Sequence, residues 1–264
     1  MAAYQATLHF RIRTNIIMFT FGVLSSLLLI YGVSGSAFGI GDEFLATERD
    51  LRRDLFQNYD KLVRPVKNPF TSVNVSVSLS PLQVTDVDDL HQRIVLDTWV
   101  LMKWSDDFLK WNLADYDISV LRLPASEIWK PDVALYTGSP DIAMFPLQNT
   151  QVLVYNNGEV LWVPPFTIKS RCPMLKTIRK DFIECSIVFG SWTFSENELD
   201  LQLLAEQADL SDFLDIHPDW KLVNIVADRK AKTYACCVEK YPSLEYNITM
   251  RRRISNFIEP AIFK

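Results

Sequence analysis

Apolar and polar residues alternate along much of the chain after residue 70, and this alternation predicts β-strands. The clearest run is Val-Asn-Val-Ser-Val-Ser-Leu over 73–79, whose period of two is typical of a strand with one buried face. Asn157-Gly158 lies between two apolar runs and carries the turn signal of a β-hairpin. The same pattern predicts the remaining strands, over 94–104, 152–155, 159–163, 182–192, 220–226 and 246–250.

A different period governs residues 41–60. Apolar and aromatic side chains recur there at helical spacing with charged residues between them, and Pro65 follows, so the pattern predicts a helix ahead of the strands. Many short strands with turns between them are typical of a β-sandwich. The predicted fold is therefore all-β, an immunoglobulin-like β-sandwich of about ten strands with an N-terminal α-helix. No repeat or low-complexity linker divides it, so residues 37–264 are predicted to form one domain.

Residues 1–36 have the order of a secretory signal peptide. Two arginines precede an apolar run over 16–33, and small residues follow it. A run of that length also approaches the threshold for a membrane span, so an uncleaved anchor is the alternative. Either way the remaining chain is expected to be secreted or extracellular, with no further segment able to span a bilayer. Sequons at Asn74 and Asn247 predict glycosylation and fit that compartment.

Charge narrows the range of partners. The whole chain has 27 basic and 32 acidic residues, and removal of residues 1–36 would leave a net charge of −7, because only two arginines and no acids lie there. Nucleic-acid binding needs a basic face, so a nucleic-acid partner is not expected. An acidic protein suits a cationic ligand, although net charge bears on steering and solubility rather than on a site.

Four cysteines follow the predicted signal peptide: Cys172, Cys185, Cys236 and Cys237. In an oxidising compartment they predict two disulfides, and of the three possible pairings we favour Cys172–Cys185 and Cys236–Cys237, because each closes a short local element. Neighbouring Cα atoms lie only ~3.8 Å apart, below the ~4.4–6.8 Å of ordinary disulfides. The second bond would therefore be strained and would stiffen a hairpin tip. The alternative is a pair of buried thiols in a strand.

Several aromatic residues are candidate ligand contacts. Tyr234 and Tyr241 flank the adjacent cysteines, so a hairpin there would carry them as a flap. Trp99 and Trp192 lie in predicted strands, and Tyr136 follows Trp129-Lys-Pro-Asp132. Trp and Tyr faces attract a cation within ~6 Å, by ~0.5–2 kcal/mol per ring, and a cage of them suits a quaternary ammonium, which cannot donate a hydrogen bond. For any one ring the alternative is packing in the core. We assign the following tryptophans to packing: Trp104, Trp111, Trp129, Trp162 and Trp220.

From about Leu51 to Arg253, five motifs in order resemble the extracellular ligand-binding domain of nicotinic acetylcholine receptors and the related secreted acetylcholine-binding proteins. Five separated motifs in family order are a far more specific signal than a single short pattern. The motifs are Asp60-Lys-Leu-Val-Arg-Pro-Val66, Trp104-Ser-Asp-Asp-Phe-Leu-Lys-Trp-Asn112, Ile128-Trp-Lys-Pro-Asp132 with Leu135-Tyr136, Gly190-Ser-Trp-Thr193, and the segment from Tyr234 to Pro242.

In that family five subunits form a ring, and each ligand site lies between neighbours. The resemblance implies that Trp99 supplies the complementary face of the site from the next subunit, beside an apolar wall of Val154, Leu161 and Val163. The implied ligand is acetylcholine or a similar small cation, with no cofactor or metal, in a homo- or hetero-pentamer. Because one chain has both halves, a homopentamer is possible. The implied principal face consists of Tyr136, Trp192, Tyr234 and Tyr241, with Cys236 and Cys237 at the flap tip.

The resemblance weakens in the loop between Cys172 and Cys185. This loop encloses 12 residues, one fewer than usual in the family, and Arg179-Lys180 replace the apolar core that rests on the membrane domain in receptors, while Asp181 keeps its place. A loop with no membrane domain to contact gains nothing from exposed apolar residues. The sequence also stops soon after Arg253, where receptors enter their first membrane helix. We therefore expect a secreted acetylcholine-binding protein; the alternative is the extracellular domain of a nicotinic-type channel subunit whose membrane part is missing from this sequence.

Other classes are less favoured. Only His91 and His217 follow the predicted signal peptide, and neither lies in a nucleophile motif, so we do not expect an enzyme. The acidic run over 85–89 lacks the glycine and the distal glutamate of a calcium loop, which favours a solvated turn. A β-sandwich adhesion module without a small ligand is a further alternative. Three acids could line the complementary face or bind a cation, although we favour a mobile acidic loop: Asp209, Asp212 and Asp215.

Overall fold

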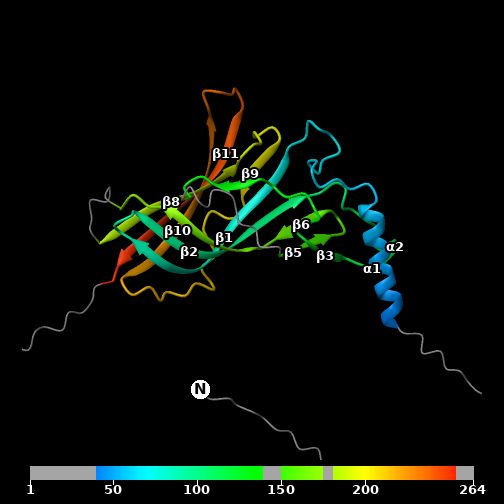
Figure 1. The fold of residues 1–264 in the computed structure, drawn as a ribbon, viewed down its shortest axis with the longest axis horizontal. Coiled ribbons are helices and arrows are strands. Elements are labelled where there is room, and N and C mark those ends of the chain that lie inside the picture. Colours follow the sequence, from blue (N-terminus) through cyan, green and yellow to red (C-terminus); the bar gives the residue numbers. More distant parts are fainter. Residues whose placement is uncertain (1–39, 139–149, 175–180, 254–264) are drawn as a thin grey trace, which may run out of the picture. The chain divides into compact units, whose positions relative to one another are not determined.

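The computed structural model describes residues 40–138, 150–174 and 181–253, with side chains from residue 48 onward (Figure 1). The predicted signal peptide over 1–36 and the Arg179-Lys180 segment lie outside the described residues. The helices are α1 (Ile40–Phe56) and α2 (Leu113–Tyr116). The strands are β1 (Val73–Asp88), β2 (Arg93–Ser105), β3 (Val120–Pro124), β4 (Val133–Leu135), β5 (Gln151–Tyr155), β6 (Glu159–Trp162), β7 (Pro165–Arg171), β8 (Phe182–Ser191), β9 (Leu199–Leu203), β10 (Trp220–Thr233) and β11 (Lys240–Arg252).

The strands of the described residues form two sheets. The larger sheet has the order β3-β5-β6-β2-β1-β9, with β7 also paired to β2, and the smaller sheet has the order β10-β11-β8-β4. All strand pairs are antiparallel except β1 and β9. The predicted all-β sandwich with an N-terminal helix is confirmed, and eleven strands are present in the described ranges where about ten were predicted.

One apolar core joins the inward faces of the two sheets. Tyr246 of β11 crosses this core: its ring lies 5.9 Å from that of Phe189, centroid to centroid, and its hydroxyl donates to the carbonyl oxygen of Val77 in β1 at 3.2 Å. A buried hydroxyl needs such a partner, so this bond links the two sheets and offsets the desolvation of the tyrosine hydroxyl. The five tryptophans assigned to packing are confirmed as core residues, each no more than 9% exposed.

The N-terminal helix ends earlier than predicted. It stops at Phe56 rather than at residue 60, and turns follow. Leu51 is buried against the sandwich, while the hydroxyl of Tyr116 in α2 donates to a carboxylate oxygen of Asp54 at 2.5 Å, so α1 and α2 lie side by side (Figure 1). Neither helix in the described ranges has the length and apolar character needed to cross a membrane.

The hairpin of β10 and β11 is much longer than predicted. Both strands extend past the other strands, as the orange hairpin in Figure 1 shows. The cause of the short prediction is the composition of the outer part, where residues 230–240 are exposed apart from the half-buried Cys237 and show no apolar alternation. The pairing continues there because the backbone hydrogen bonds of the hairpin do not need a buried face. Tyr234 and Tyr241 are thereby carried to the tip of a projecting flap.

Both predicted disulfides are present, and all four cysteines are paired. Cys172 follows β7, and its bond to Cys185 in β8 joins the two sheets at a point where both residues are buried. Cys236 and Cys237 form the adjacent pair at the turn between β10 and β11, with Cα atoms 3.8 Å apart. The alternative of buried thiols at 236 and 237 is therefore wrong.

Candidate functional site

A cavity of about 490 Å³ lies where the end of β8 meets the flap. The structure brings together all six residues that the resemblance assigns to the principal face, although they come from three separate parts of the chain. A cavity walled mainly by aromatic rings offers π faces and few hydrogen-bond partners. Its wall consists of Tyr136, Ser191, Trp192, Thr193, Tyr234, Cys236, Cys237 and Tyr241.

Trp192 follows directly on β8, and its side chain is 60% exposed. Asp132 fixes the turn that carries it. The carbonyl oxygen of Asp132 accepts from the Trp192 N–H at 3.1 Å, and one carboxylate oxygen accepts from Ser191 Oγ at 2.5 Å. The other carboxylate oxygen accepts from the backbone N–H and the hydroxyl of Thr193 at 2.7 and 2.6 Å. Both neighbours of Trp192 are therefore held by one carboxylate, which positions an otherwise exposed indole.

Tyr136 lies across β8 at Gly190. A Cβ at this glycine would stand 2.3 Å from Tyr136 Cζ, so only glycine leaves room for the ring. The Tyr136 hydroxyl donates to the carbonyl oxygen of Ser191, and its ring packs edge to face with Trp192 at a centroid distance of 6.3 Å. The tyrosine and the tryptophan thus form one aromatic corner of the cavity.

The pKa of Tyr136 is raised from 10.0 to about 12, mainly by burial and next by the neighbouring Tyr234 and by Asp132. The hydroxyl therefore stays protonated at physiological pH and remains available as a donor to Ser191. Any attraction of this side chain for a cation then comes from the neutral ring and its oxygen dipole rather than from a phenolate.

The flap contributes the opposite aromatic corner. Tyr234 and Tyr241 face each other across the hairpin at a centroid distance of 5.6 Å, with their rings 72° apart. The turn between them is closed by a hydrogen bond from the Cys237 N–H to the Tyr234 carbonyl oxygen at 3.1 Å. The ammonium of Lys232 lies 5.0 Å from the centroid of the Tyr234 ring, so this ring already attracts a cation within the chain itself.

The residues assigned to the complementary face lie elsewhere. Trp99 is 38% exposed on the outer face of β2 in the larger sheet, and it does not line the aromatic cavity. Val163 is 39% exposed just after β6, and Leu161 is half-buried on the outward side of the same strand. One chain therefore carries two separate surfaces, an aromatic cavity on the smaller sheet and an exposed Trp99 region on the larger one.

Val154 is a correction to the predicted apolar wall. Its side chain is 0% exposed and belongs to the core. Residues alternate between the two faces of β5, and Val152 and Val154 both point inward, so the outward positions belong to Leu153 and Tyr155. The position next to Leu161 on the outer face is Leu153, which is its paired residue in the β5–β6 ladder.

The remaining predicted polar sites are accounted for separately. Within the described residues no cluster of three or more His, Cys, Asp or Glu could hold a metal ion. The first acidic run is tied down by basic groups: Arg93 and His91 both bond to Asp88, and Arg93 is the main reason why the pKa of that carboxyl lies below its usual value. In the second acidic loop, Asp215 pairs with Arg253 at 2.6 Å, and Asp212 lines a second cavity of about 440 Å³.

The two sequon asparagines are both accessible. Asn74 is exposed on β1, and Asn247 is exposed on β11. The side-chain oxygen of Asn247 accepts from Ser186 Oγ at 2.6 Å, so attachment of a sugar there would act on a hydrogen-bonded amide. Glycosylation at both sites stays a prediction.

Asp132, Gly190 and Thr193 lie inside the sequence motifs, but the motifs alone predict no role for them. The structure assigns Asp132 and Thr193 to the support of Trp192, and Gly190 to the seat of Tyr136. A glycine in the interior of a strand is a recognised sign of close approach by another group, so Gly190 was detectable in principle. The role of Asp132 was not, because its partners lie about 60 positions away.

The whole described domain matches one protein family. The family described as the neurotransmitter-gated ion-channel ligand binding domain matches residues 48–254, and the chain belongs to this family. The resemblance inferred from the motifs is thereby confirmed. This is a family of ligand-binding domains and not of enzymes.

Individual relatives are acetylcholine receptor subunits. The chain is 34% identical over 212 residues to neuronal acetylcholine receptor subunit alpha-9-II of Oncorhynchus mykiss, covering 80% of this chain and 38% of that one. It is 34% identical over 225 residues to the neuronal alpha-6 subunit of Homo sapiens, covering 83% and 45%. It is 38% identical over 221 residues to acetylcholine receptor subunit alpha-type acr-16 of Caenorhabditis briggsae, covering 81% and 44%. The chain thus spans less than half the length of these relatives.

Proposed function

We propose that this chain is an acetylcholine-binding protein-like domain, which captures acetylcholine or a related small organic cation in an aromatic cage between neighbouring subunits. The observation that carries the proposal is the convergence of Tyr136, Trp192, Tyr234 and Tyr241 on one cavity beneath the adjacent cysteine pair. A quaternary ammonium has no hydrogen to donate, and rings that present π faces are its natural partners, at ~0.5–2 kcal/mol per ring. The names of the relatives, which are acetylcholine receptor subunits, support the same ligand.

Binding would proceed by exchange of water for ligand. A cation entering the cavity approaches the π faces of the four rings and displaces the water that hydrates Trp192, which is 60% exposed in the single chain. The flap then closes over the cation and brings Tyr234 and Tyr241 toward Trp192. Desolvation strengthens each cation–π contact, so closure and binding support each other.

The proposed assembly is a ring of five subunits. The cavity is incomplete in one chain, because no described side chain covers the exposed side of Trp192. The Trp99 region offers what is missing, an exposed indole on the outer face of the larger sheet, the face that also carries Val163 and Leu161. A neighbour that places its Trp99 against the cavity would complete the cage. Both surfaces belong to one chain, which supports a homopentamer, and a heteropentamer with related subunits is the alternative.

The chain is proposed to act outside the cell as a secreted protein. The observation that favours this is the sequence of the Cys172–Cys185 loop, where Arg179-Lys180 stand in place of an apolar core. The second candidate is the extracellular domain of a nicotinic-type channel subunit, and it is favoured by the relatives, which are receptor subunits more than twice as long as the match. Transcript sequencing past the codon for Lys264 decides between them: a stop codon supports the secreted protein, and four apolar spans support the channel.

Light scattering and ligand titration test the binding proposal. The secreted chain is passed through size exclusion with light scattering, and acetylcholine is then titrated while tryptophan fluorescence is recorded. We expect the mass of five chains and a saturable fluorescence change. Trp192→Ala should abolish binding and leave the mass unchanged, whereas Phe70→Ala, which removes an aromatic side chain that is 92% exposed and does not line the cavity, should alter neither. Unchanged acetylcholine affinity in Trp192→Ala would refute the site.

A further inference from the structure

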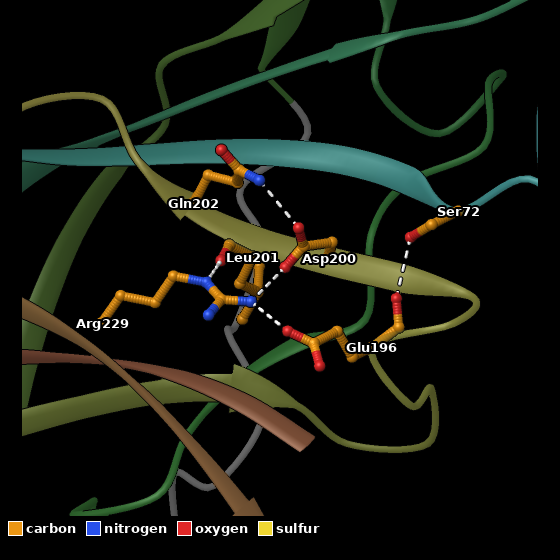
Figure 2. A network of polar contacts seen from close by, with 6 residues as sticks. All are labelled: Ser72, Glu196, Asp200, Leu201, Gln202 and Arg229. Carbon is orange, nitrogen blue, oxygen red and sulfur yellow. Dashed lines mark hydrogen bonds and ion pairs between the residues drawn. The ribbon is translucent and has the colours of Figure 1, made fainter. Parts of the chain in front are cut away.

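The stem of the flap is held to the larger sheet by a group of charged side chains, which we call the stem cluster: Arg229, Glu196 and Asp200. Figure 2 shows the Arg229 guanidinium between the two carboxylates. Its Nη2 donates to Glu196 Oε1 at 2.5 Å and to Asp200 Oδ1 at 2.6 Å, and its Nε donates to the carbonyl oxygen of Leu201 at 2.8 Å. Arg229 belongs to β10, and its three partners belong to β9 and to the turn before it.

Glu196 touches both strands of the flap. Its carboxylate binds Arg229 on β10, and its backbone N–H donates to the carbonyl oxygen of Lys240, the first residue of β11, at 2.8 Å. Glu196 follows Trp192 by only four residues. One short segment, residues 192–196, therefore carries the indole of the cavity and also binds the flap. A displacement of the stem would be transmitted directly to the geometry between Trp192 and the flap tyrosines.

The partners of Arg229 are themselves anchored. Ser72 Oγ donates to the Glu196 carbonyl oxygen at 3.0 Å, and Gln202 Nε2 donates to Asp200 Oδ2 at 2.7 Å, as Figure 2 shows. The carboxylates of Glu196 and Asp200 are only 32% and 18% exposed, so water screens these contacts less than it screens surface ion pairs. The stem cluster thus joins the flap to β9 and to the start of β1, two elements of the larger sheet.

The outer part of the flap, residues 231–239, has no ion pair to any other element that the structure describes. These residues are exposed apart from the half-buried Cys237, and the ion pair next to them, Lys230 with Glu245, stays within the hairpin. A hairpin that is paired internally and attached only at its stem moves about that stem as one body. Arg229 lies five residues before Tyr234. Its guanidinium therefore acts at the base about which both flap tyrosines would swing, together with the Glu196–Lys240 backbone bond and the pairing of β11 with β8 from Ser243 onward.

We propose that Arg229 is a positioning residue: its contacts with Glu196, Asp200 and the Leu201 carbonyl set the resting position of the flap over the cavity, and so set the residence time of the bound cation. The residence-time part rests on the proposed function, and the part on flap position does not. Arg229 does not line the cavity, so it acts through Tyr234 and Tyr241 rather than by touching the ligand.

Hydrogen–deuterium exchange and ligand kinetics on the secreted chain test this proposal. In Arg229→Gln without ligand, we expect faster exchange of the backbone amides over 231–241 and of the Glu196 amide, which donates to Lys240. We expect acetylcholine to dissociate about three- to tenfold faster, the size of effect that partly exposed ion pairs produce. Association should change by less than about twofold, because a looser flap does not obstruct entry. Arg229→Lys keeps the positive charge but lacks the planar guanidinium, so its exchange and dissociation rates should lie between those of Arg229→Gln and wild type.

Lys230→Gln is the matched control. It removes the same charge from the neighbouring position of β10 and breaks an ion pair, but that pair lies within the hairpin, so neither exchange at the flap nor ligand dissociation should change.

Wild-type exchange at the flap in folded Arg229→Gln overturns the proposal, and faster exchange with unchanged dissociation overturns its residence-time part. If wild type binds no acetylcholine, the proposed function fails while the exchange result still decides the role of Arg229. If Arg229→Gln does not fold, Glu196→Gln and Asp200→Asn answer the same question, each expected to loosen the flap to a smaller extent.

Discussion

Asp132→Asn is the sharpest test of how Trp192 is positioned. The substitution keeps the size of the side chain and replaces one accepting oxygen with an NH2 group. Asp132 accepts three hydrogen bonds through its carboxylate, one from Ser191 Oγ and two from Thr193. If the amide oxygen faces Thr193, the NH2 group faces the Ser191 hydroxyl, which must reorient. In the opposite orientation the NH2 group faces the Thr193 N–H, and two donors confront each other. Neither orientation satisfies all three partners as the carboxylate does.

The expected magnitude follows from these contacts. Hydrogen bonds to charged groups contribute about 1.5–3 kcal/mol each, and the better orientation of asparagine loses the charge assistance of all three bonds and the acceptor of one. We expect the free energy of unfolding to fall by about 2 kcal/mol. The Trp192 N–H keeps its partner, because the carbonyl oxygen of Asp132 is unaffected. The indole should therefore become less well positioned rather than lost, and acetylcholine affinity should fall about three- to tenfold.

Denaturant unfolding and acetylcholine titration, both followed by tryptophan fluorescence, measure the two effects. Asp209→Asn is the control, because its carboxylate is exposed, bonds to the nearby Ser211 and does not line the aromatic cavity. Its acetylcholine affinity should equal that of wild type. Wild-type stability together with wild-type affinity in Asp132→Asn would refute the idea that this carboxylate holds the tryptophan.

Two further predictions concern Tyr136. Gly190→Ala places a Cβ 2.3 Å from Tyr136 Cζ, so the ring must retreat by about 1.2 Å to reach a normal carbon–carbon distance; we expect about 1–3 kcal/mol of destabilisation and weaker acetylcholine binding. In a Tyr136→Ala background the Gly190→Ala substitution should cause little further destabilisation. An equal loss of stability in both backgrounds would contradict this explanation. The second prediction is that the free energy of unfolding falls at alkaline pH. Burial raises the pKa of Tyr136 in the folded protein from 10.0 to about 12, so its contribution to stability is intact below pH 10 and is lost as the pH rises toward 12. Unfolding free energies measured across that range should decline less in Tyr136→Phe, and an identical decline would argue against a perturbed Tyr136.

Part of the fold was predictable because it depends on local pattern. The alternation over 73–79 and the Asn-Gly turn identify β1 and the β5–β6 hairpin. The outer flap was not predictable in this way, since residues 230–240 have no buried face to impose a period. Short strands such as β4, with three residues, leave too little pattern to detect. The parallel pairing of β1 with β9 depends on contacts between residues more than 120 positions apart.

The residues of the candidate site also differ in how far the sequence predicts them. The aromatic residues were found because their types and motif order are distinctive, and the structure brings the principal-face residues to one cavity. The prediction for Val154 was wrong because side chains alternate along β5: Val152 is buried, so Val154 two residues later is buried as well. Asp132 and Arg229 were missed as supports because a lone Asp or Arg carries no sign of its distant partners. The role of Asp132 depends on the packing of β4 beside β8, and the role of Arg229 depends on the packing of β10 beside β9.

The account depends most on attraction between a positive charge and the Trp192 ring. The direct measurement compares the Kd of acetylcholine with that of its uncharged isostere, in which carbon replaces the ammonium nitrogen, for wild type and for Trp192→Leu. We predict that wild type prefers the charged ligand by roughly 30-fold or more, the equivalent of ~2 kcal/mol from a desolvated cation–π contact, and that Trp192→Leu loses most of this preference. An equal preference for the charged ligand in both proteins would contradict the account.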